Sequence, residues 1–297
     1  MTFQQKLDAI VEKNNSLLCV GLDPDFEKLP GRFKKKKHPQ FAFNKFIVDQ
    51  TYDLVCCYKP NSAFYEARGA EGISELKMTC DHIHEKYPEI PVLLDFKRGD
   101  IGNTNRAYAK FAFEYLNADA ITLQPYQGIE ALQPFLDYKE KGIFILCKTS
   151  NPGSGEFQNI HIRHPEFISG SQTTKMLKWI RQTHHPEFTE GQVQHDRLYE
   201  YVAFQVVNKW NKNKNCFLVV GATYPKELKR IREIVRDMTI LVPGIGHQAG
   251  DLEKTLKAGL NAKKAGLIVV VSRSIIFAKN PRGEAEKLRS EINSFRS

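Results

Sequence analysis

The sequence lacks the long hydrophobic runs of a membrane protein: its longest apolar runs, such as 265–271, fall far short of the ~20 residues that a membrane-spanning helix needs. The first ten residues carry Lys6 and Asp8 and have no apolar core, so we expect neither a secretion signal nor a membrane partner. The six cysteines show no CxxC spacing, and most lie within apolar runs. We therefore expect buried free thiols in a reducing cytoplasm instead of a disulfide framework.

The excess of positive charge is confined to one part of the chain. The 297 residues include 43 basic and 34 acidic side chains, and residues 212–297 alone hold 17 basic and 8 acidic ones. These charges are mixed in sign along helix-like stretches such as 226–236, and no aromatic residues alternate with them to stack on bases. We expect solvated helix faces and a local anion site here, and no nucleic-acid partner.

Short apolar runs alternate with helix-like segments along the chain. The expected strands are 17–22, 54–59, 92–97, 120–123, 143–148, 217–221, 239–242 and 267–271. The expected helices are 41–52, 72–86, 104–116, 129–136, 198–210, 226–236 and 251–258. This alternation predicts a parallel sheet with crossover helices, and eight such units close into an α/β fold, the (β/α)8 TIM barrel. A doubly wound open sheet is the alternative, but no GxGxxG follows the first strand.

One region after the fifth strand interrupts the alternation. Residues 160–197 have no clean period, repeat HPEF at 164–167 and 185–188, and hold five of the nine histidines. A metal site is the alternative interpretation, but no cysteine and no tight histidine–carboxylate spacing accompanies them. Without this segment about 260 residues remain, a usual barrel length. We predict one domain, 1–297, in which 160–197 is an inserted surface segment with a short helix near 174–181.

Charged residues follow several of the expected strands, at the end where TIM barrels place their active sites. Asp95 and Lys97 are two residues apart on one strand, so their side chains should point to the same face, and Asp100 follows a tight turn. Asp23 and Lys59 end the first two strands. Because charges in a barrel mouth are costly unless they are paired, we expect these five side chains to form one compensated network.

The ends of strands seven and eight predict a phosphate site. Residues 243–246 read Pro-Gly-Ile-Gly, and such glycines let backbone N–H groups approach an anion; Gln248 follows. Arg273 follows the last strand, where its planar guanidinium suits phosphate oxygens. After strand five, residues 150–155 form either an ordinary turn or a mobile lip that carries the Ser150 hydroxyl to a ligand.

These motifs, in this order, resemble those of orotidine 5′-monophosphate decarboxylases. Residues 95–104 match the signature D-x-K-x-x-D-I-x-x-T of that family. The supporting motifs are GLDP at 21–24, YKPN at 58–61, SNPGS at 150–154, VPGIG at 242–246 and SRS at 272–274. The resemblance covers nearly the whole chain and is nearest to the longer bacterial subgroup. The family pattern does not include 160–197, and Ser272 stands where many relatives have glycine.

The resemblance implies decarboxylation of orotidine 5′-monophosphate to uridine 5′-monophosphate in de novo pyrimidine biosynthesis, by a lyase without metal or organic cofactor. It implies that Lys97 protonates a stabilised C6 carbanion and that Asp95 and Asp100 are the other catalytic residues. It also implies a homodimer in which Asp100 and Thr104 reach the active site of the partner subunit. The substrate-binding residues that it implies are Asp23, Lys59, Thr104, Ser150, Pro243, Gly244, Gly246, Gln248, Ser272 and Arg273.

Two other functions compete with this one. A sugar-phosphate decarboxylase of the same barrel superfamily would use Mg²⁺ and an acidic residue at the end of strand two, where Lys59 stands instead. A nucleic-acid- or phosphate-binding protein without catalysis fits the net charge of +9. That second class gives no reason for charges gathered at strand ends.

Overall fold

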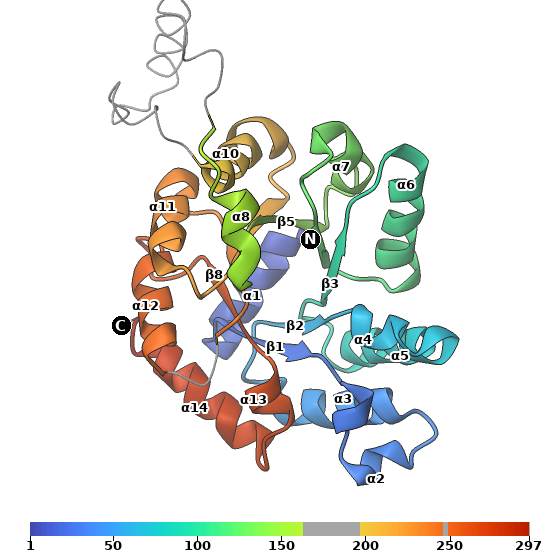
Figure 1. The fold of residues 1–297 in the computed structure, drawn as a ribbon. Coiled ribbons are helices and arrows are strands. Elements are labelled where there is room, and N and C mark those ends of the chain that lie inside the picture. The colour runs from blue at the N-terminus through green and yellow to red at the C-terminus, as the bar shows by residue number, and fades with distance from the viewer. Residues whose placement is uncertain (163–196, 246–248, 297) are drawn as a thin grey trace, which may run out of the picture.

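A computed structural model describes residues 1–162, 197–245 and 249–296, and within them eight parallel strands form a ring (Figure 1). The strands are β1 (Leu18–Leu22), β2 (Cys57–Pro60), β3 (Leu93–Arg98), β4 (Ala120–Leu123), β5 (Gly142–Lys148), β6 (Cys216–Val220), β7 (Ile240–Val242) and β8 (Leu267–Val271). Their order around the sheet is β2-β1-β8-β7-β6-β5-β4-β3. Isolated bridges, Tyr58 to Val92 and Asn61 to Asp95, join β2 to β3 and close the ring. The predicted (β/α)8 barrel is confirmed.

Helices follow the strands and surround the barrel. They are α3 (Pro39–Thr51), α5 (Gly69–Lys86), α6 (Gly102–Lys110), α7 (Gly128–Leu136), α10 (Leu198–Gln205), α11 (Pro225–Val235), α12 (Ala249–Gly259) and α14 (Pro281–Asn293). Two of them, α6 and α10, continue into π-helical turns at Phe111–Tyr115 and Val206–Trp210. The short helices are α2 (Gly31–Lys34), α4 (Ala63–Glu66), α8 (Gly155–Gln158) and α13 (Arg273–Ile276). The sequence pattern predicted all of the long outer helices except α14.

Burial explains why these segments take these forms. Every residue of β1, β5, β6 and β8 is buried, as expected for parallel strands covered on both faces. Helix α11 buries Leu228, Ile231 and Val235, which recur at helical spacing. Of its charged residues only Arg232 is buried, and its guanidinium donates to the Gly259 carbonyl. All six cysteines are free and buried, as predicted. No helix among the described residues has both the length and the apolar character needed to cross a membrane.

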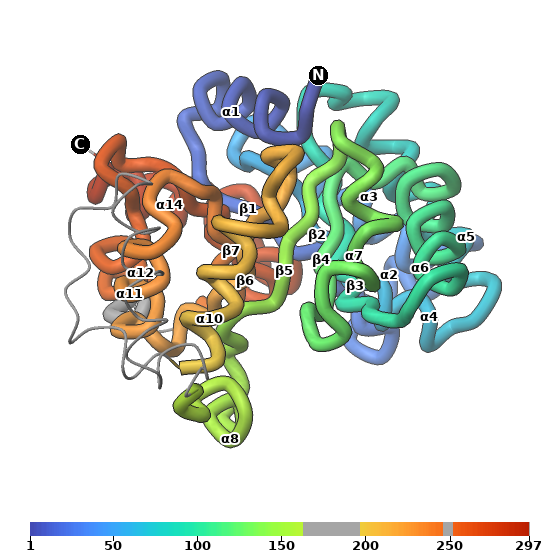
Figure 2. The backbone as a smooth tube through the Cα atoms, turned by 90° about the horizontal axis from the view of Figure 1, so that it is seen from above, coloured from blue at the N-terminus to red at the C-terminus, as the bar shows by residue number. Residues whose placement is uncertain are grey.

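Helix α1 (Phe3–Asn14), which the sequence pattern did not predict, lies across the amino-terminal ends of the strands (Figure 2). The ring of Phe3 lies 5.5 Å from that of Phe144 in β5 and 5.4 Å from that of Phe217 in β6. Gly142, the first residue of β5, permits this contact, because a Cβ there would lie 2.6 Å from the Phe3 ring. Helix α1 thus covers one end of the barrel and leaves the carboxyl ends of the strands for a site.

The inserted segment leaves the barrel after β5 and returns before α10, where the sequence predicted it. His161 and Arg197 pair in an antiparallel bridge, and the Leu198 N–H donates to the Ile160 carbonyl at 3.0 Å. The two ends of the segment therefore lie side by side. Residues 163–196, including the helix expected near 174–181, lie outside the described residues, so the surface placement of 160–197 stays a prediction.

Candidate active site

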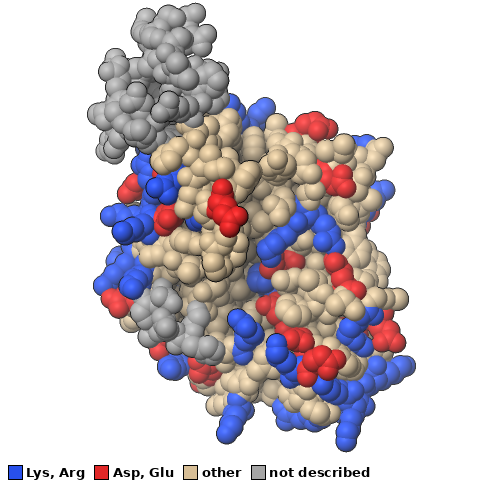
Figure 3. Space-filling model, in the orientation of Figure 1, with Lys and Arg blue, Asp and Glu red and all other residues tan. Residues whose placement is uncertain are grey.

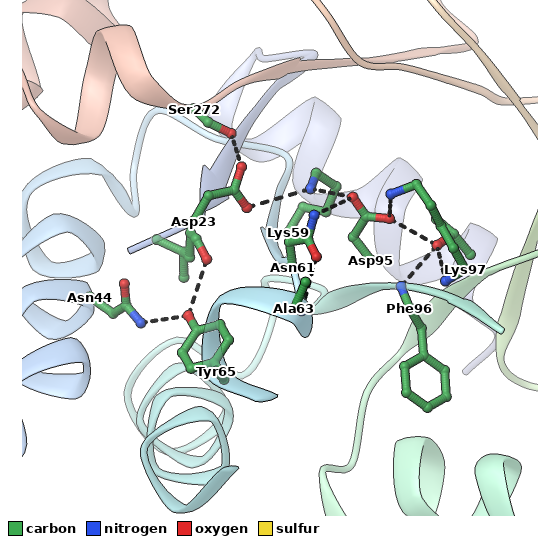
Figure 4. A network of polar contacts seen from close by, with 12 residues as sticks. Asp23, Asn44, Lys59, Asn61, Ala63, Tyr65, Asp95, Phe96, Lys97 and Ser272 are labelled. Carbon is green, nitrogen blue, oxygen red and sulfur yellow. Dashed lines mark hydrogen bonds and ion pairs between the residues drawn. The ribbon is translucent and has the colours of Figure 1, made fainter. Parts of the chain in front are cut away.

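Four charged side chains form a continuous row across the carboxyl ends of β1, β2 and β3 (Figure 4). Lys59 Nζ lies 2.9 Å from Asp95 Oδ2 and 3.8 Å from Asp23 Oδ1. The Lys97 ammonium pairs with the other oxygen, Asp95 Oδ1. The signs alternate along the row, so each charge is next to an opposite one, as the sequence analysis expected of these four residues.

The two most buried members of the row, Lys59 and Asp95, stabilise each other's charged form. Burial lowers the pKa of Lys59, which is 3% exposed, but the carboxylates of Asp23 and Asp95 outweigh this effect and hold that pKa above its usual range. Burial raises the pKa of Asp95, but Lys59 and Lys97 outweigh it and hold the pKa of that carboxyl well below its usual range. Lys97 itself is 45% exposed, so its ammonium is the member of the row that a ligand can reach.

Neutral groups also hydrogen-bond to the two carboxylates. Ser272 Oγ donates to Asp23 Oδ2 at 2.7 Å. Thr122 Oγ1 donates to Asp95 Oδ1 at 3.0 Å, and Asn61 Nδ2 lies 3.4 Å from Asp95 Oδ2. Asp23 Oδ1 is buried and accepts no hydrogen bond from the described residues, and its nearest charged partner is Lys59 Nζ at 3.8 Å. The sequence analysis missed Thr122, although it is the only polar residue of β4.

Gly21 makes room for the contact between Ser272 and Asp23. A Cβ at Gly21 would lie 1.8 Å from Ser272 Oγ, so any larger residue would displace the serine. Ser272 was expected to bind substrate where many relatives have glycine. In this chain its hydroxyl orients the Asp23 carboxylate, which is a positioning contact within the protein.

Asp100 does not join the row within this chain, so the expected network of five is corrected to one of four. Its Oδ1 accepts from the Ile101 N–H at 2.7 Å, and its own N–H donates to Asn105 Oδ1 at 3.1 Å. Among the described residues no ion pair links Asp100 to Lys97. The physical reason is the turn after β3, which carries Asp100 to the start of α6. Thr104, on α6, is exposed to solvent.

Arg273 begins α13 directly after β8 and is exposed. Its guanidinium makes no ion pair or side-chain hydrogen bond with the part of the chain that the structure describes, so its forked donors are available to an anion. Figure 3 shows a hollow on this face with basic and acidic side chains at its rim. Two other expected phosphate contacts, Gly246 and Gln248, lie outside the described residues.

Ser150 lies against the loops that follow β6 and β7. A Cβ at Gly221 would lie 2.7 Å from Ser150 Cα, and a Cβ at Gly244 would lie 3.1 Å from Ser150 Cβ. Gly244 also has φ +93°, a conformation that favours glycine. The preceding residue, Pro243, accepts a hydrogen bond from the Ala222 N–H at 2.9 Å. The structure thus brings Ser150, Pro243 and Gly244 together, beside the barrel mouth.

A buried lysine that sequence reasoning missed anchors the turn after β5. Lys148 Nζ donates to Ser154 Oγ at 2.8 Å and lies 4.3 Å from the centre of the Tyr224 ring. Tyr224 OH in turn donates to the Asn151 carbonyl at 3.1 Å. Of the two alternatives for residues 150–155, these contacts favour a turn that is fixed at Asn151 and Ser154.

Comparison with known proteins shows the family to which this chain belongs. A sequence model of the orotidine 5′-phosphate decarboxylase / HUMPS family matches residues 16–166 and 171–288. The chain belongs to this family. It is 42% identical, over the full length of both chains, to an orotidine 5′-phosphate decarboxylase of Cellvibrio japonicus, and 43% identical to that of Dechloromonas aromatica. The solved structure of Leishmania donovani OMP decarboxylase is 38% identical, with a TM-score of 0.80 over 100% of this chain and 99% of that chain.

The comparisons correct one expectation about the inserted segment. The family match omits only residues 167–170 of the segment 160–197, and relatives align over the whole of this chain. The segment therefore has counterparts within the family, contrary to the expectation that the family pattern does not include it. Sequence reasoning erred because a stretch without periodicity carries no short motif by which a counterpart is recognised. Among the described residues, no group of three or more histidine, cysteine or acidic side chains is placed to hold a metal ion.

Proposed function

We propose that this chain removes the carboxyl group of orotidine 5′-monophosphate to give uridine 5′-monophosphate, in de novo pyrimidine biosynthesis and without a cofactor. The reaction is the one after which its relatives are named. The observation that carries the proposal is the row Asp23–Lys59–Asp95–Lys97, which ends in an accessible ammonium at the barrel mouth.

The substrate lies along the carboxyl ends of the strands, with its three parts on three groups of residues. Its phosphate binds Arg273, whose guanidinium is exposed and unpaired with described residues, and the backbone N–H of Gly244, next to which Pro243 lies. A ribose hydroxyl donates to the Asp23 carboxylate, and Lys59 lies beside it. Ser150 hydrogen-bonds the pyrimidine. Gly246 and Gln248 complete the phosphate site in this proposal.

The base is placed with C6 next to Lys97. The bond between C6 and the carboxyl carbon breaks, carbon dioxide leaves, and the electron pair stays on C6. The Lys97 ammonium stabilises this carbanion and gives it a proton, so that C6 becomes C–H; the amine then recovers a proton from solvent. Asp95, held between two lysines, pairs with the Lys97 ammonium and keeps it in place. Contacts to the distant phosphate supply binding energy that orders the site.

The active unit is a homodimer in which Asp100 and Thr104 reach the site of the partner subunit. Three observations support this part of the proposal. Asp100 makes no ion pair with Lys97 within the described chain, Thr104 is exposed, and Ile101 between them is an apolar side chain that is 59% exposed. A cytoplasmic location is proposed as well, because six free thiols suit a reducing compartment.

The competing enzyme named in the sequence analysis is a metal-dependent sugar-phosphate decarboxylase. In such an enzyme an acidic residue at the end of strand two would help to hold Mg²⁺. Lys59 occupies that position and its ammonium would repel a cation. The row therefore favours the cofactor-free reaction.

One absorbance assay separates the two chemistries. Purified enzyme is given orotidine 5′-monophosphate with and without a chelator, and loss of substrate absorbance is followed. We expect turnover that the chelator does not change, and a loss of at least ~1000-fold in Lys97→Ala, about 4 kcal/mol of barrier. Turnover that requires added Mg²⁺, or a folded Lys97→Ala protein with near-normal turnover, would contradict the proposal.

A further inference from the structure

The hydroxyl of Thr122, on β4, contacts the part of β3 that carries Asp95 and Lys97. It accepts hydrogen bonds from the N–H groups of Phe96 at 2.9 Å and Lys97 at 3.0 Å, and donates to Asp95 Oδ1 at 3.0 Å. Thr122 is 1% exposed, so water cannot replace it as the partner of these groups. One buried hydroxyl thus contacts three successive residues of β3.

The pairing of β3 with β4 is irregular at this place. Leu94 pairs with Ile121 and Arg98 pairs with Leu123, so three residues of β3 lie opposite the single residue Thr122. A bulge of this kind leaves backbone N–H groups without the partners that a regular ladder provides. The threonine hydroxyl supplies the missing acceptor.

Lys97 also has an unusual backbone conformation. Its φ is +46°, in the left-handed region that a long side chain rarely adopts. Such a conformation persists only where surrounding contacts impose it. The hydrogen bond from the Lys97 N–H to the Thr122 hydroxyl is a contact made by the backbone of the strained residue itself. Figure 4 shows the side chains of Lys97 and Phe96 on opposite sides of the chain.

We propose that Thr122 is a positioning residue: its hydroxyl holds Lys97 in the left-handed conformation and fixes Asp95, so that both side chains meet in the row. The expected effect of Thr122 on turnover rests on the proposed function, whereas its expected effect on the conformation of Lys97 does not. Serine keeps the hydroxyl. Valine keeps the shape but leaves two N–H groups without their acceptor and removes one of the two donors to Asp95 Oδ1.

The test compares Thr122→Val with Thr122→Ser. For valine we expect kcat to fall by about 100-fold while KM for orotidine 5′-monophosphate changes less than about threefold, because the phosphate and ribose contacts remain. For serine we expect kcat within about fivefold of the native value. Thr51→Val is the matched control: Thr51 is equally buried, and its hydroxyl bonds the Ile47 carbonyl and the Tyr58 hydroxyl. Because Tyr58 and Lys59 are successive residues of β2, their side chains point to opposite faces of the strand, so kcat should not change.

A folded Thr122→Val protein with native kcat, or a serine variant as damaged as the valine variant, would overturn the inference. If the valine variant does not fold, Thr122→Ala is compared with serine by the same criteria. Crystal structures give a readout that needs no activity: φ of Lys97 should leave the left-handed region in the valine variant and stay there in the serine variant. If the native enzyme does not turn over orotidine 5′-monophosphate, the proposed function fails, whereas the structural comparison still decides the role of Thr122.

Discussion

Lys59 and Asp95 form an ion pair of 2.9 Å between β2 and β3. These two neighbouring strands are joined by isolated backbone bridges, whereas the other neighbouring strands pair in ladders. Both side chains are buried, at 3% and 8% exposure. The same contact therefore serves two purposes. It places the charged row at the barrel mouth, and it ties together the two strands whose backbone pairing is weakest.

Replacing Lys59 by methionine should destabilise the fold, because it leaves the buried carboxylate of Asp95 with one lysine instead of two. We expect a loss of about 3 kcal/mol in the free energy of unfolding, measured by urea denaturation. Lys257→Met is the control, since it breaks an exposed pair with Glu253 and should cost less than ~0.5 kcal/mol. Equally small losses of unfolding free energy in both variants would show that the Lys59–Asp95 pair does not stabilise the contact between β2 and β3.

Acidification should reduce stability through Asp95. Its pKa is lowered in the folded state, so its contribution is complete above the unfolded value near 4 and is lost as pH falls through the folded value. Asp95→Asn should therefore be less stable than the native protein at pH 6, and the difference should shrink below pH 4. Urea denaturation at several pH values measures this. A difference that stays constant down to the lowest pH at which both proteins fold would contradict the assignment.

Hybrid dimers test the shared active site. In a mixture of inactive Lys97→Ala and inactive Asp100→Ala proteins, each heterodimer has one site with neither change. Equal mixing after subunit exchange should restore about a quarter of native activity, since half of the dimers are hybrid and one of their two sites is intact. Mixing each variant with itself is the control. If exchange is demonstrated by mass labelling and activity does not return, Asp100 does not act across the interface.

Arg273→Ala should weaken binding of the nucleotide through its phosphate. We expect kcat/KM for orotidine 5′-monophosphate to fall by about 100-fold or more, and that for orotidine, which lacks the phosphate, to change little. Arg282→Ala is the control, because it removes a half-buried arginine that pairs with Asp53 and Glu286 instead of facing the barrel mouth unpaired. Equal losses on both substrates would indicate a structural role for Arg273.

The inserted segment should be dispensable for catalysis. Because His161 and Arg197 are paired, a short Gly/Ser linker can replace residues 163–196 without moving β5 or α10. The length of a flexible loop also has a small effect on stability, because the free-energy cost of closing it grows by only about 0.6 kcal/mol per doubling of length. We expect a folded dimer with most of its kcat/KM, measured by the absorbance assay. A loss of a hundredfold or more in such a dimer would show that the segment takes part in the reaction.

The sequence predicted the barrel because its strands are nearly continuous apolar runs, and covered parallel strands require such runs. It did not predict α1 or α14, whose residues are mostly polar and whose helical pattern is weak without the barrel beside them. The spacing of Asp95 and Lys97 predicted that they share a face. It could not predict the bulge, because the left-handed conformation of Lys97 depends on a hydroxyl from another strand. For the same reason the position of Asp100 could not be read from its motif.

Helix α1 covers the amino-terminal end of the barrel, with Phe3 seated on Phe144 and Phe217. The interior of such a barrel is filled by side chains, so no passage runs through it. Substrate entry, escape of carbon dioxide and departure of the nucleotide product therefore all use the same opening, at the carboxyl ends of the strands. Any motion that narrows this opening slows all three steps together. In that case kcat depends on how often the opening widens as well as on how fast the carbon–carbon bond breaks.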